Sequence, residues 1–393
     1  MNSRYTAPVT PPLRSRLPAV GTTVFSTMSA LAARHGAVNL GQGFPDFACD
    51  PRLTDAVAAA MRAGFNQYPM MAGAAPLREA IAAKLAAVYD HRYDAASEIT
   101  VTAGATQGII TAILCCVHPG DEVIVIEPAY DSYVPSITLA GGVPVLVQMT
   151  VGAHDGYAVP WSEVAAAVTP KTRLIIINTP HNPTGTVLRA ADLRALADIV
   201  RGTDVLILAD EVYEHMVYDG ARHESVSRYP ELAARSFVVS SFGKTYHVTG
   251  WKVGYVAAPA ALTAEFRKVH QYNVFTVNTP MQHGIADYLR DPAPYLELPA
   301  FYQRKRDLFR AGLQGSRFEL LPADGTYFQC VRYDAISDLP ELEFAQWLTS
   351  DIKVAAIPVS AFYQQPRESG IVRFCFAKQD ETLALALTRL ASL

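Results

Sequence analysis

The feature that most constrains the fold is an alternation of short apolar runs with amphipathic helical stretches along the central region of the chain. The clearest apolar runs are rich in β-branched residues and cover 123–126, 174–177, 205–208 and 237–240. Between the second and third runs, segment 189–200 carries apolar residues at helical spacing. Such alternation is typical of parallel strands joined by helices. The sequence therefore predicts an α/β fold built on a mostly parallel sheet.

The pattern changes after about residue 285. A long helical stretch, roughly 294–313, precedes strand-like pieces at 327–331 and 371–376. At 393 residues the chain is long enough for two domains. We expect three segments: an N-terminal arm with part of a small domain at 1–50, a large domain at 51–285, and a small α+β domain at 286–393.

Composition and charge exclude several classes of function. The formal net charge of −4 does not favour nucleic acid or an anionic membrane surface as a partner. The five cysteines lack metal-ligand spacing, and their odd number argues against a disulfide framework. The first 20 residues lack the apolar core of a secretory signal, and the uncharged stretches 99–120 and 132–153 are interrupted by Gly and Pro. We expect a cytoplasmic protein without a membrane span or a metal site.

Polar and aromatic residues follow the four apolar runs. Tyr130 follows the first run, Asn182 the second, Asp210 and Tyr213 the third, and Lys244 the fourth. In open parallel sheets, ligands bind beyond the carboxyl ends of the strands. These side chains therefore predict a ligand site at that edge of the sheet.

Lys244 and Asp210 indicate the chemistry of this site. An arbitrary lysine after a strand is usually a surface residue, and a lone aspartate there is often a helix cap or an ion-pair partner. A desolvated lysine, however, has a depressed pKa and can attack a carbonyl to form a Schiff base. A buried aspartate needs a cationic partner, which a protonated pyridine nitrogen would supply. Together the two residues favour pyridoxal phosphate as cofactor.

A second group of residues has the properties of a phosphate site. Segment 102–108 places small residues at the start of an expected helix, where backbone N–H groups attract anions. Ser241 and Lys252 lie near Lys244 in the sequence. Arg373 lies within an apolar run and is either an edge ion pair or a clamp for a substrate carboxylate. Tyr130 either packs on the core or stacks on a cofactor ring.

Four motifs in this order carry a family resemblance: NTPHNPTG (178–185), ADEVY (209–213), SFGKTYHVTGWKVGY (241–255) and VRFCF (372–376). Together they resemble the class I aminotransferases of pyridoxal-phosphate fold type I, from about Val38 to near the C-terminus. This resemblance implies a large three-layer αβα domain and a small α+β domain. VNLGQGFPDF (38–47) resembles the branch of kynurenine/glutamine and bacterial methionine aminotransferases, and HQYNVFTVNTP (270–280) resembles the methionine-preferring members.

The resemblance implies a role for each cofactor-binding residue. Lys244 would be the Schiff-base lysine and general base, and Asp210 would pair with the pyridine nitrogen. Tyr213 and Asn182 would hold the phenolate oxygen, while Tyr130 would stack on the ring. The implied phosphate ligands are Gly104, Ala105, Thr106, Ser241 and Lys252. The family often has arginine where Lys252 stands, which changes bidentate geometry but keeps the charge.

The resemblance also implies the substrate contacts. Arg373, with Asn182 and the backbone at Gly43, would bind the substrate α-carboxylate. Tyr68 resembles the tyrosine that reaches the neighbouring subunit's phosphate, which implies a homodimer with shared active sites. Phe25 and Phe275 stand where this branch places the aromatic residues of the side-chain pocket. No Arg or Lys lies between residues 271 and 283, so we expect a preference for neutral side chains.

These observations predict a ping-pong transamination between a neutral L-amino acid (methionine, aromatic or glutamine-like) and a 2-oxo acid. Two alternatives remain at this point. A cysteine-S-conjugate β-lyase would use the same residues when the substrate carries a leaving group at Cβ. A non-catalytic pyridoxal-phosphate-binding regulator is disfavoured, because every expected catalytic position is present and no DNA-binding module is appended. The sequence does not rank the neutral amino acids against one another.

Overall fold

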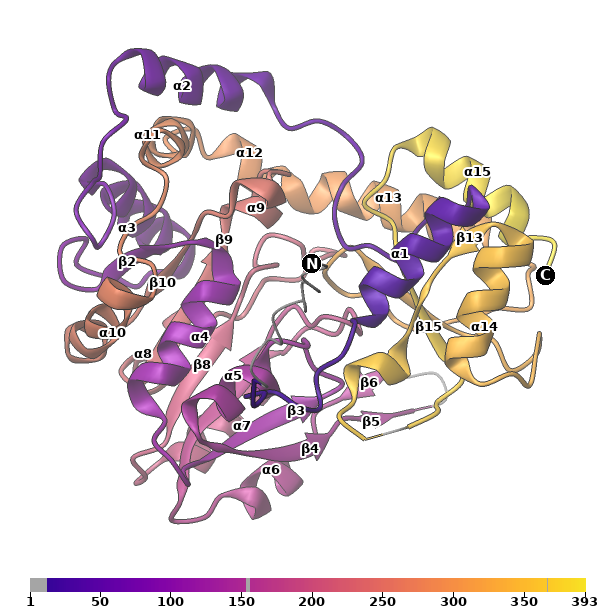
Figure 1. Ribbon diagram of the computed structural model, residues 1–393, viewed down its shortest axis with the longest axis horizontal. Coiled ribbons are helices and arrows are strands. Elements are labelled where there is room, and N and C mark those ends of the chain that lie inside the picture. The colour runs from indigo at the N-terminus through magenta and orange to yellow at the C-terminus, as the bar shows by residue number, and fades with distance from the viewer. Residues whose placement is uncertain (1–12, 153–155, 366) are drawn as a thin grey trace, which may run out of the picture.

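A seven-stranded sheet forms the centre of the molecule (Figure 1). The computed structural model describes residues 13–152, 156–365 and 367–393. The strands, in spatial order, are β2 (Ile99–Thr102), β10 (Gly254–Ala257), β9 (Ser236–Ser241), β8 (Leu206–Asp210), β7 (Thr172–Asn178), β3 (Glu122–Glu127) and β4 (Val143–Gln148). Strand β10 runs antiparallel to both neighbours, whereas the pairs from β9 to β4 are parallel. The predicted mostly parallel sheet is confirmed.

Helices cover both faces of this sheet. Successive residues of β3 show the division, since Val123 and Val125 belong to one core and Ile124 and Ile126 to the other. The first core includes residues of α4 (Gly104–Cys116), α5 (Tyr133–Ala140) and α10 (Ala260–Asn273). The second includes residues of α2 (Pro51–Arg62), α3 (Ala75–Tyr89), α6 (Trp161–Ala167), α7 (Ala190–Val200), α8 (Pro230–Ala233) and α11 (Thr279–Tyr288). The result is a three-layer αβα arrangement.

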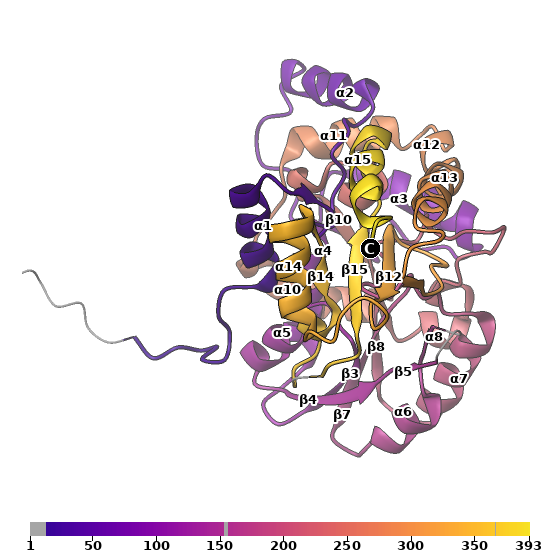
Figure 2. The ribbon, with the colours of Figure 1, turned by 90° about the vertical axis from the view of Figure 1, so that its right-hand side faces the viewer.

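A second, antiparallel sheet lies beside the first. Its strands, in spatial order, are β11 (Glu319–Leu320), β12 (Phe328–Arg332), β15 (Ile371–Cys375) and β14 (Ile357–Pro358). Helices α13 (Leu298–Gly312), α14 (Glu341–Trp347) and α15 (Asp380–Leu390) contribute to its core. Helix α1 (Val24–His35) lies beside α14 (Figure 2), and Met28 of α1 packs with Ala345. Strand β1 (Val38–Asn39) pairs with β13 (Val354–Ala355), so residues before 50 join this unit.

The helical stretch predicted at 294–313 is divided in the structure. Helix α12 (Ala293–Leu296) ends before Glu297, and α13 begins at Leu298. Pro299 occupies the first turn of α13. A proline has no N–H to donate and is accommodated in a first turn rather than in a helix interior, so one continuous helix does not form. The domain boundaries at 50 and 285 stay predictions.

The remaining short elements connect these units. They are β5 (Thr150–Val151), β6 (Tyr157–Ala158), α9 (Phe242–Thr245), the 3₁₀ turns η1 (Val226–Arg228), η2 (Thr249–Trp251) and η4 (Val359–Phe362), and the π turn η3 (Leu348–Ile352). All five cysteines are free thiols. Among the described residues, no helix is long and apolar enough to cross a membrane. The same residues contain no group of His, Cys, Asp and Glu side chains arranged to hold a metal ion.

Candidate active site

A cavity of about 190 Å³ lies at the carboxyl ends of β7, β8 and β9. It is lined by most of the predicted site residues: Gly104, Ala105, Thr106, Tyr130, Asn182, Asp210, Tyr213, Ser241, Lys244 and Lys252. Four further residues complete the lining: Ile109, Asn178, Val212 and Thr249. The parallel strands therefore bring together side chains that are more than 140 positions apart in the sequence, at the edge where ligands of such sheets bind.

Lys244 lies in the short helix α9, directly after β9. Its Nζ donates to the Tyr327 hydroxyl at 3.0 Å and to the Gly43 carbonyl at 3.2 Å. The rings of Tyr213 and Tyr327 each lie 5.6 Å from Nζ. Burial lowers the pKa of Lys244 to about 8. A substantial share of neutral amine is therefore present near neutral pH, as nucleophilic and base chemistry requires.

Asp210 ends β8 and is 4% exposed. Its Oδ2 accepts a hydrogen bond from the Tyr133 hydroxyl at 2.7 Å. Burial raises the pKa of Asp210 to about 6, and the bond from Tyr133 opposes this rise. No ion pair to Asp210 is formed by the described residues. A buried carboxylate that lines a cavity without a cationic partner suits the protonated nitrogen of a pyridine ring.

An anion cradle lies at the other end of the cavity. Helix α4 begins at Gly104, and its N-cap residue Ala103 makes no side-chain cap, which leaves N–H groups of the first turn open. A Cβ added at Gly104 would lie 3.1 Å from Lys252 Nζ, so the glycine permits the ammonium to approach the helix start. Ser241 and Lys252 line the same cavity. Helix N–H groups, a hydroxyl and an ammonium together suit a phosphate group.

Arg373 occupies the interior strand β15 and is 1% exposed. It donates to Asn182 Oδ1 at 2.6 Å and to the Gly41 carbonyl at 3.1 Å, while its Nε is buried without a partner. No carboxylate among the described residues forms an ion pair with it. The position of β15 between β12 and β14 rules out the edge ion pair that the sequence left open. A buried guanidinium with free donor capacity suits a ligand carboxylate.

The comparisons with known proteins agree with this geometry. Residues 36–390 match the family described as Aminotransferase class I and II. The chain belongs to this family. Pyridoxal phosphate, the predicted cofactor, is the cofactor of these enzymes, and the chain is an aminotransferase of the α/β fold type I class.

Three relatives show how similar this aminotransferase is to known enzymes in sequence and in structure. The Escherichia coli methionine aminotransferase is 50% identical, over 97% of this chain and 98% of its own. A crystal structure of an Escherichia coli protein with a methionine aminotransferase function superimposes with a TM-score of 0.95 at 49% identity, covering 98% of this chain and 100% of the other. A kynurenine–oxoglutarate transaminase of Dictyostelium discoideum is 35% identical over 95% of this chain and 94% of its own.

A structure with a different named substrate is also similar. The N-succinyldiaminopimelate aminotransferase of Mycobacterium tuberculosis has a TM-score of 0.93 and is 42% identical, covering 97% of this chain and 100% of the other. The names of these relatives agree on amino transfer and differ in the amino donor. The predicted family and enzyme class are therefore confirmed, whereas the donor belongs to the proposal below.

Some predicted residues of the aminotransferase lie elsewhere in this single chain. Tyr68 is 81% exposed, and its ring contacts Phe275 at 5.3 Å between centroids. Neither residue lines the cavity around Lys244. Phe25 lies at Arg373, with its ring centroid 5.7 Å from the guanidinium carbon. Gly43 offers its carbonyl to Lys244. The single chain therefore does not bring Tyr68 and Phe275 to this cavity, and their predicted roles stay predictions.

Sequence reasoning missed several residues that support the site. Tyr133 follows Tyr130 by three positions, and the two rings contact each other at 5.6 Å; this helical spacing after a strand end was the available signal. Tyr327 and Phe328 begin a predicted strand, but the segment lies 83 positions from Lys244. Their role follows from the docking of the second sheet onto the first. No local pattern could have revealed it.

Proposed function

We propose that this aminotransferase moves the amino group between a neutral L-amino acid and a 2-oxo acid in a two-step ping-pong reaction. The amino acid is methionine or one with an aromatic or glutamine-like side chain. The observation that supports the donor class most is the aromatic wall around Arg373. The rings of Phe328, Phe362 and Phe25 lie 3.9, 4.9 and 5.7 Å from its guanidinium carbon. Apolar rings around the carboxylate clamp favour an uncharged side chain over a second carboxylate.

Lys244 is the proposed base of the reaction. Pyridoxal phosphate, when bound, supplies an electrophilic carbon and a ring that accepts the electron pair left at the substrate Cα. The neutral Lys244 Nζ removes the Cα proton and returns a proton to complete each half-reaction. The Tyr327 hydroxyl and the Gly43 carbonyl, which both contact Nζ, hold it in position.

The other cavity residues are proposed to hold the cofactor. Asp210 would pair with the ring nitrogen, and Tyr213 and Asn182 would hold the phenolate oxygen. Tyr130 would stack on the cofactor ring; its own hydroxyl lies 3.1 Å from Thr106 Oγ1, and this contact orients the tyrosine side chain. The proposed phosphate ligands are Gly104, Ala105, Thr106, Ser241 and Lys252. Arg373 with Asn182 binds the substrate carboxylate, helped by the backbone near Gly43.

We also propose a cytoplasmic homodimer with shared active sites. The stretch 65–70 lies against segment 275–283: Tyr68 contacts Phe275, and Phe65 stacks on His283. Tyr68 and Met70 are 81% and 72% exposed. Exposed aromatic and methionine side chains of this kind are enriched at subunit interfaces. In the dimer, Tyr68 would reach the partner's phosphate and Phe275 the partner's side-chain pocket.

A panel of amino donors with one fixed 2-oxo acid acceptor tests the donor class. We expect kcat/KM to be highest for methionine or another neutral donor and at least about tenfold lower for aspartate and glutamate. A dominant preference for an acidic donor would refute the neutral pocket. Incubation with a cysteine S-conjugate separates the lyase alternative, because elimination releases pyruvate. The names of the relatives do not favour that alternative.

A further inference from the structure

A second cavity, of about 350 Å³, lies next to the candidate active site without sharing a lining residue with it. The segment after β8 separates the two, since Tyr213 lines the first cavity and Glu214 the second. The second cavity is bounded by the end of α3, segment 214–223, Arg228 of η1, and helices α12 and α13. Its walls therefore come from both sides of the junction between the large sheet and α13.

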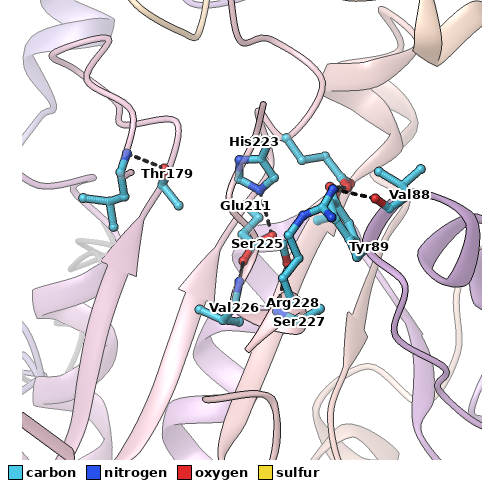
Figure 3. Close-up of polar contacts among 12 residues, drawn as sticks. Val88, Tyr89, Thr179, Glu211, His223, Ser225, Val226, Ser227 and Arg228 are labelled. Carbon is cyan, nitrogen blue, oxygen red and sulfur yellow. Dashed lines mark hydrogen bonds and ion pairs between the residues drawn. The ribbon is translucent and has the colours of Figure 1, made fainter. Parts of the chain in front are cut away.

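The carboxylates near this cavity already have partners. Glu214 accepts hydrogen bonds from Lys84, Ser240 and Tyr255, and from the hydroxyl of Tyr89. Figure 3 shows that Glu211 faces the ring of His223; its oxygens lie 2.9 Å from His223 Nε2 and 3.0 Å from the Val226 amide. These two carboxylates therefore have little remaining capacity to neutralise another cation.

Arg228, by contrast, is an uncompensated cation. Its Nη2 donates to the Val88 carbonyl at 2.6 Å, and its guanidinium carbon lies 5.2 Å from the centroid of Tyr89 (Figure 3). Its Nε is buried without a hydrogen-bond partner. Among the residues that the structure describes, no carboxylate forms an ion pair with Arg228. A partly buried guanidinium in this state favours an anion from outside the chain.

Two buried histidines form part of the same walls. His215 and His223 are 7% and 6% exposed and line the cavity. His215 Nε2 and His223 Nδ1 are buried without hydrogen-bond partners. Burial lowers the pKa of His215 to about 3, so this imidazole is neutral and repels neither sign of charge. Its Nε2 lies 3.8 Å from Glu214 Oε2 and has no accessible surface, so His215 bounds the cavity as an uncharged side chain.

We propose that this cavity binds a small organic anion through a carboxylate. Arg228 binds the carboxylate. The exposed Arg222 adds a second positive charge at the rim, although its Nη2 donates to Glu224 Oε1 at 3.1 Å. The uncharged body of the ligand packs against the apolar side of the cavity, where Tyr295 and Leu296 lie. Ligand sites commonly combine a few charged groups with apolar walls in this way. This inference does not depend on the proposed donor class.

Calorimetric titration of the holoenzyme with phenylacetate tests the proposal, and cofactor absorbance is followed in parallel. Phenylacetate can also enter the candidate active site, and that event shifts the absorbance. We expect a second binding event without an absorbance change. Arg228→Gln should weaken that event by at least about tenfold and leave the first unchanged. Arg201→Gln, at an exposed arginine outside both cavities, is the matched control.

Two substitutions of opposite charge at one exposed position separate an electrostatic effect on binding from an effect on folding. Leu296 is 60% exposed and lines the cavity, so it tolerates polar residues. Leu296→Glu should weaken the binding event that has no absorbance change by about tenfold, whereas Leu296→Lys should retain that event. Inorganic phosphate serves as a second probe: we expect it to bind more weakly than phenylacetate. The proposal would be overturned if the wild type showed no binding event without an absorbance change, if Leu296→Glu and Leu296→Lys had equal effects, or if phosphate bound more tightly than phenylacetate.

Discussion

The hydroxyl of Tyr133 donates a hydrogen bond to Asp210 Oδ2 at 2.7 Å, inside the core between α5 and the end of β8. This bond is the side-chain contact that favours the ionised form of a carboxylate whose pKa burial raises to about 6. The contact links a residue of a covering helix to the proposed partner of the cofactor ring. We therefore propose that Tyr133 is a positioning residue for cofactor binding.

Tyr133→Phe removes this bond while keeping the ring. A hydrogen bond to a charged group contributes about 1.5–3 kcal/mol, so we expect the dissociation constant of pyridoxal phosphate to rise by at least about tenfold. Equilibrium dialysis, followed by the cofactor's absorbance, measures this constant. Tyr272→Phe, at a tyrosine that is 91% exposed, is the matched control. Unchanged affinity in Tyr133→Phe would show that Asp210 does not need the bond.

Asp210 gives the cofactor-free protein a defined pH dependence. Because its pKa is raised from 3.8 to about 6, the folded state binds more protons than the unfolded state between these pH values. The free energy of unfolding therefore falls as pH rises through this window. Asp210→Asn does not titrate, so the stability of the apoprotein variant relative to the wild type should grow through this window and reach about 3 kcal/mol above pH 6. Urea unfolding at several pH values measures this.

With the cofactor bound, the same substitution should act in the opposite direction. An asparagine cannot balance a protonated ring nitrogen, so the holoenzyme variant should lose both cofactor affinity and turnover. If Asp210→Asn stabilises the apoprotein and weakens cofactor binding, the negative charge of Asp210 serves to pair with the cofactor ring. A variant that is destabilised in both states would indicate a packing role instead.

Lys244→Ala should abolish the reaction. Loss of the proposed base costs about 10²–10⁴-fold in rate, and loss of the amine also removes covalent attachment of the cofactor. We expect turnover of methionine with a 2-oxo acid to fall by at least about 10²-fold. Lys171→Ala, at an exposed lysine, should retain wild-type turnover. A Lys244→Ala enzyme of near wild-type rate would refute the proposed mechanism.

Arg373→Lys keeps the positive charge and removes the planar fork. Its two present bonds, to Asn182 and Gly41, show that the guanidinium is held by its geometry. We expect kcat/KM for the amino donor to fall by about 10–100-fold, mainly through KM, with cofactor affinity unchanged. Steady-state kinetics and the cofactor titration separate these two outcomes. A loss of cofactor affinity equal to the loss in kcat/KM would contradict a substrate role.

Mixing two inactive variants tests whether active sites are shared. If Tyr68 completes the partner's site, Tyr68→Ala and Lys244→Ala should each be impaired. In a hybrid dimer the site that keeps Lys244 receives an intact Tyr68 from the partner. Random exchange of equal amounts should therefore restore about a quarter of the wild-type activity. Mixtures no more active than the average of the two variants would mean that Tyr68 serves its own subunit.

The local sequence determined the elements and the edge at which the site lies. The apolar runs at 123–126 and 174–177 became β3 and β7, because a doubly covered parallel strand needs apolar residues on both faces. Since the carboxyl ends of parallel strands meet at one edge, the positions of Asp210 and Lys244 after their strands were enough to predict that they converge. The motifs around them then identified the family.

Tertiary structure alone decided which residues support these groups. The contact of Lys244 with Tyr327 and that of Arg373 with the ring of Phe328 arise where the antiparallel sheet docks onto the parallel one. Such contacts join segments far apart in the sequence, and no periodicity encodes them. Burial also set the pKa of Lys244, because desolvation depends on every segment that surrounds the amine. Local pattern places a chemical group on its element; packing decides its partners and its charge.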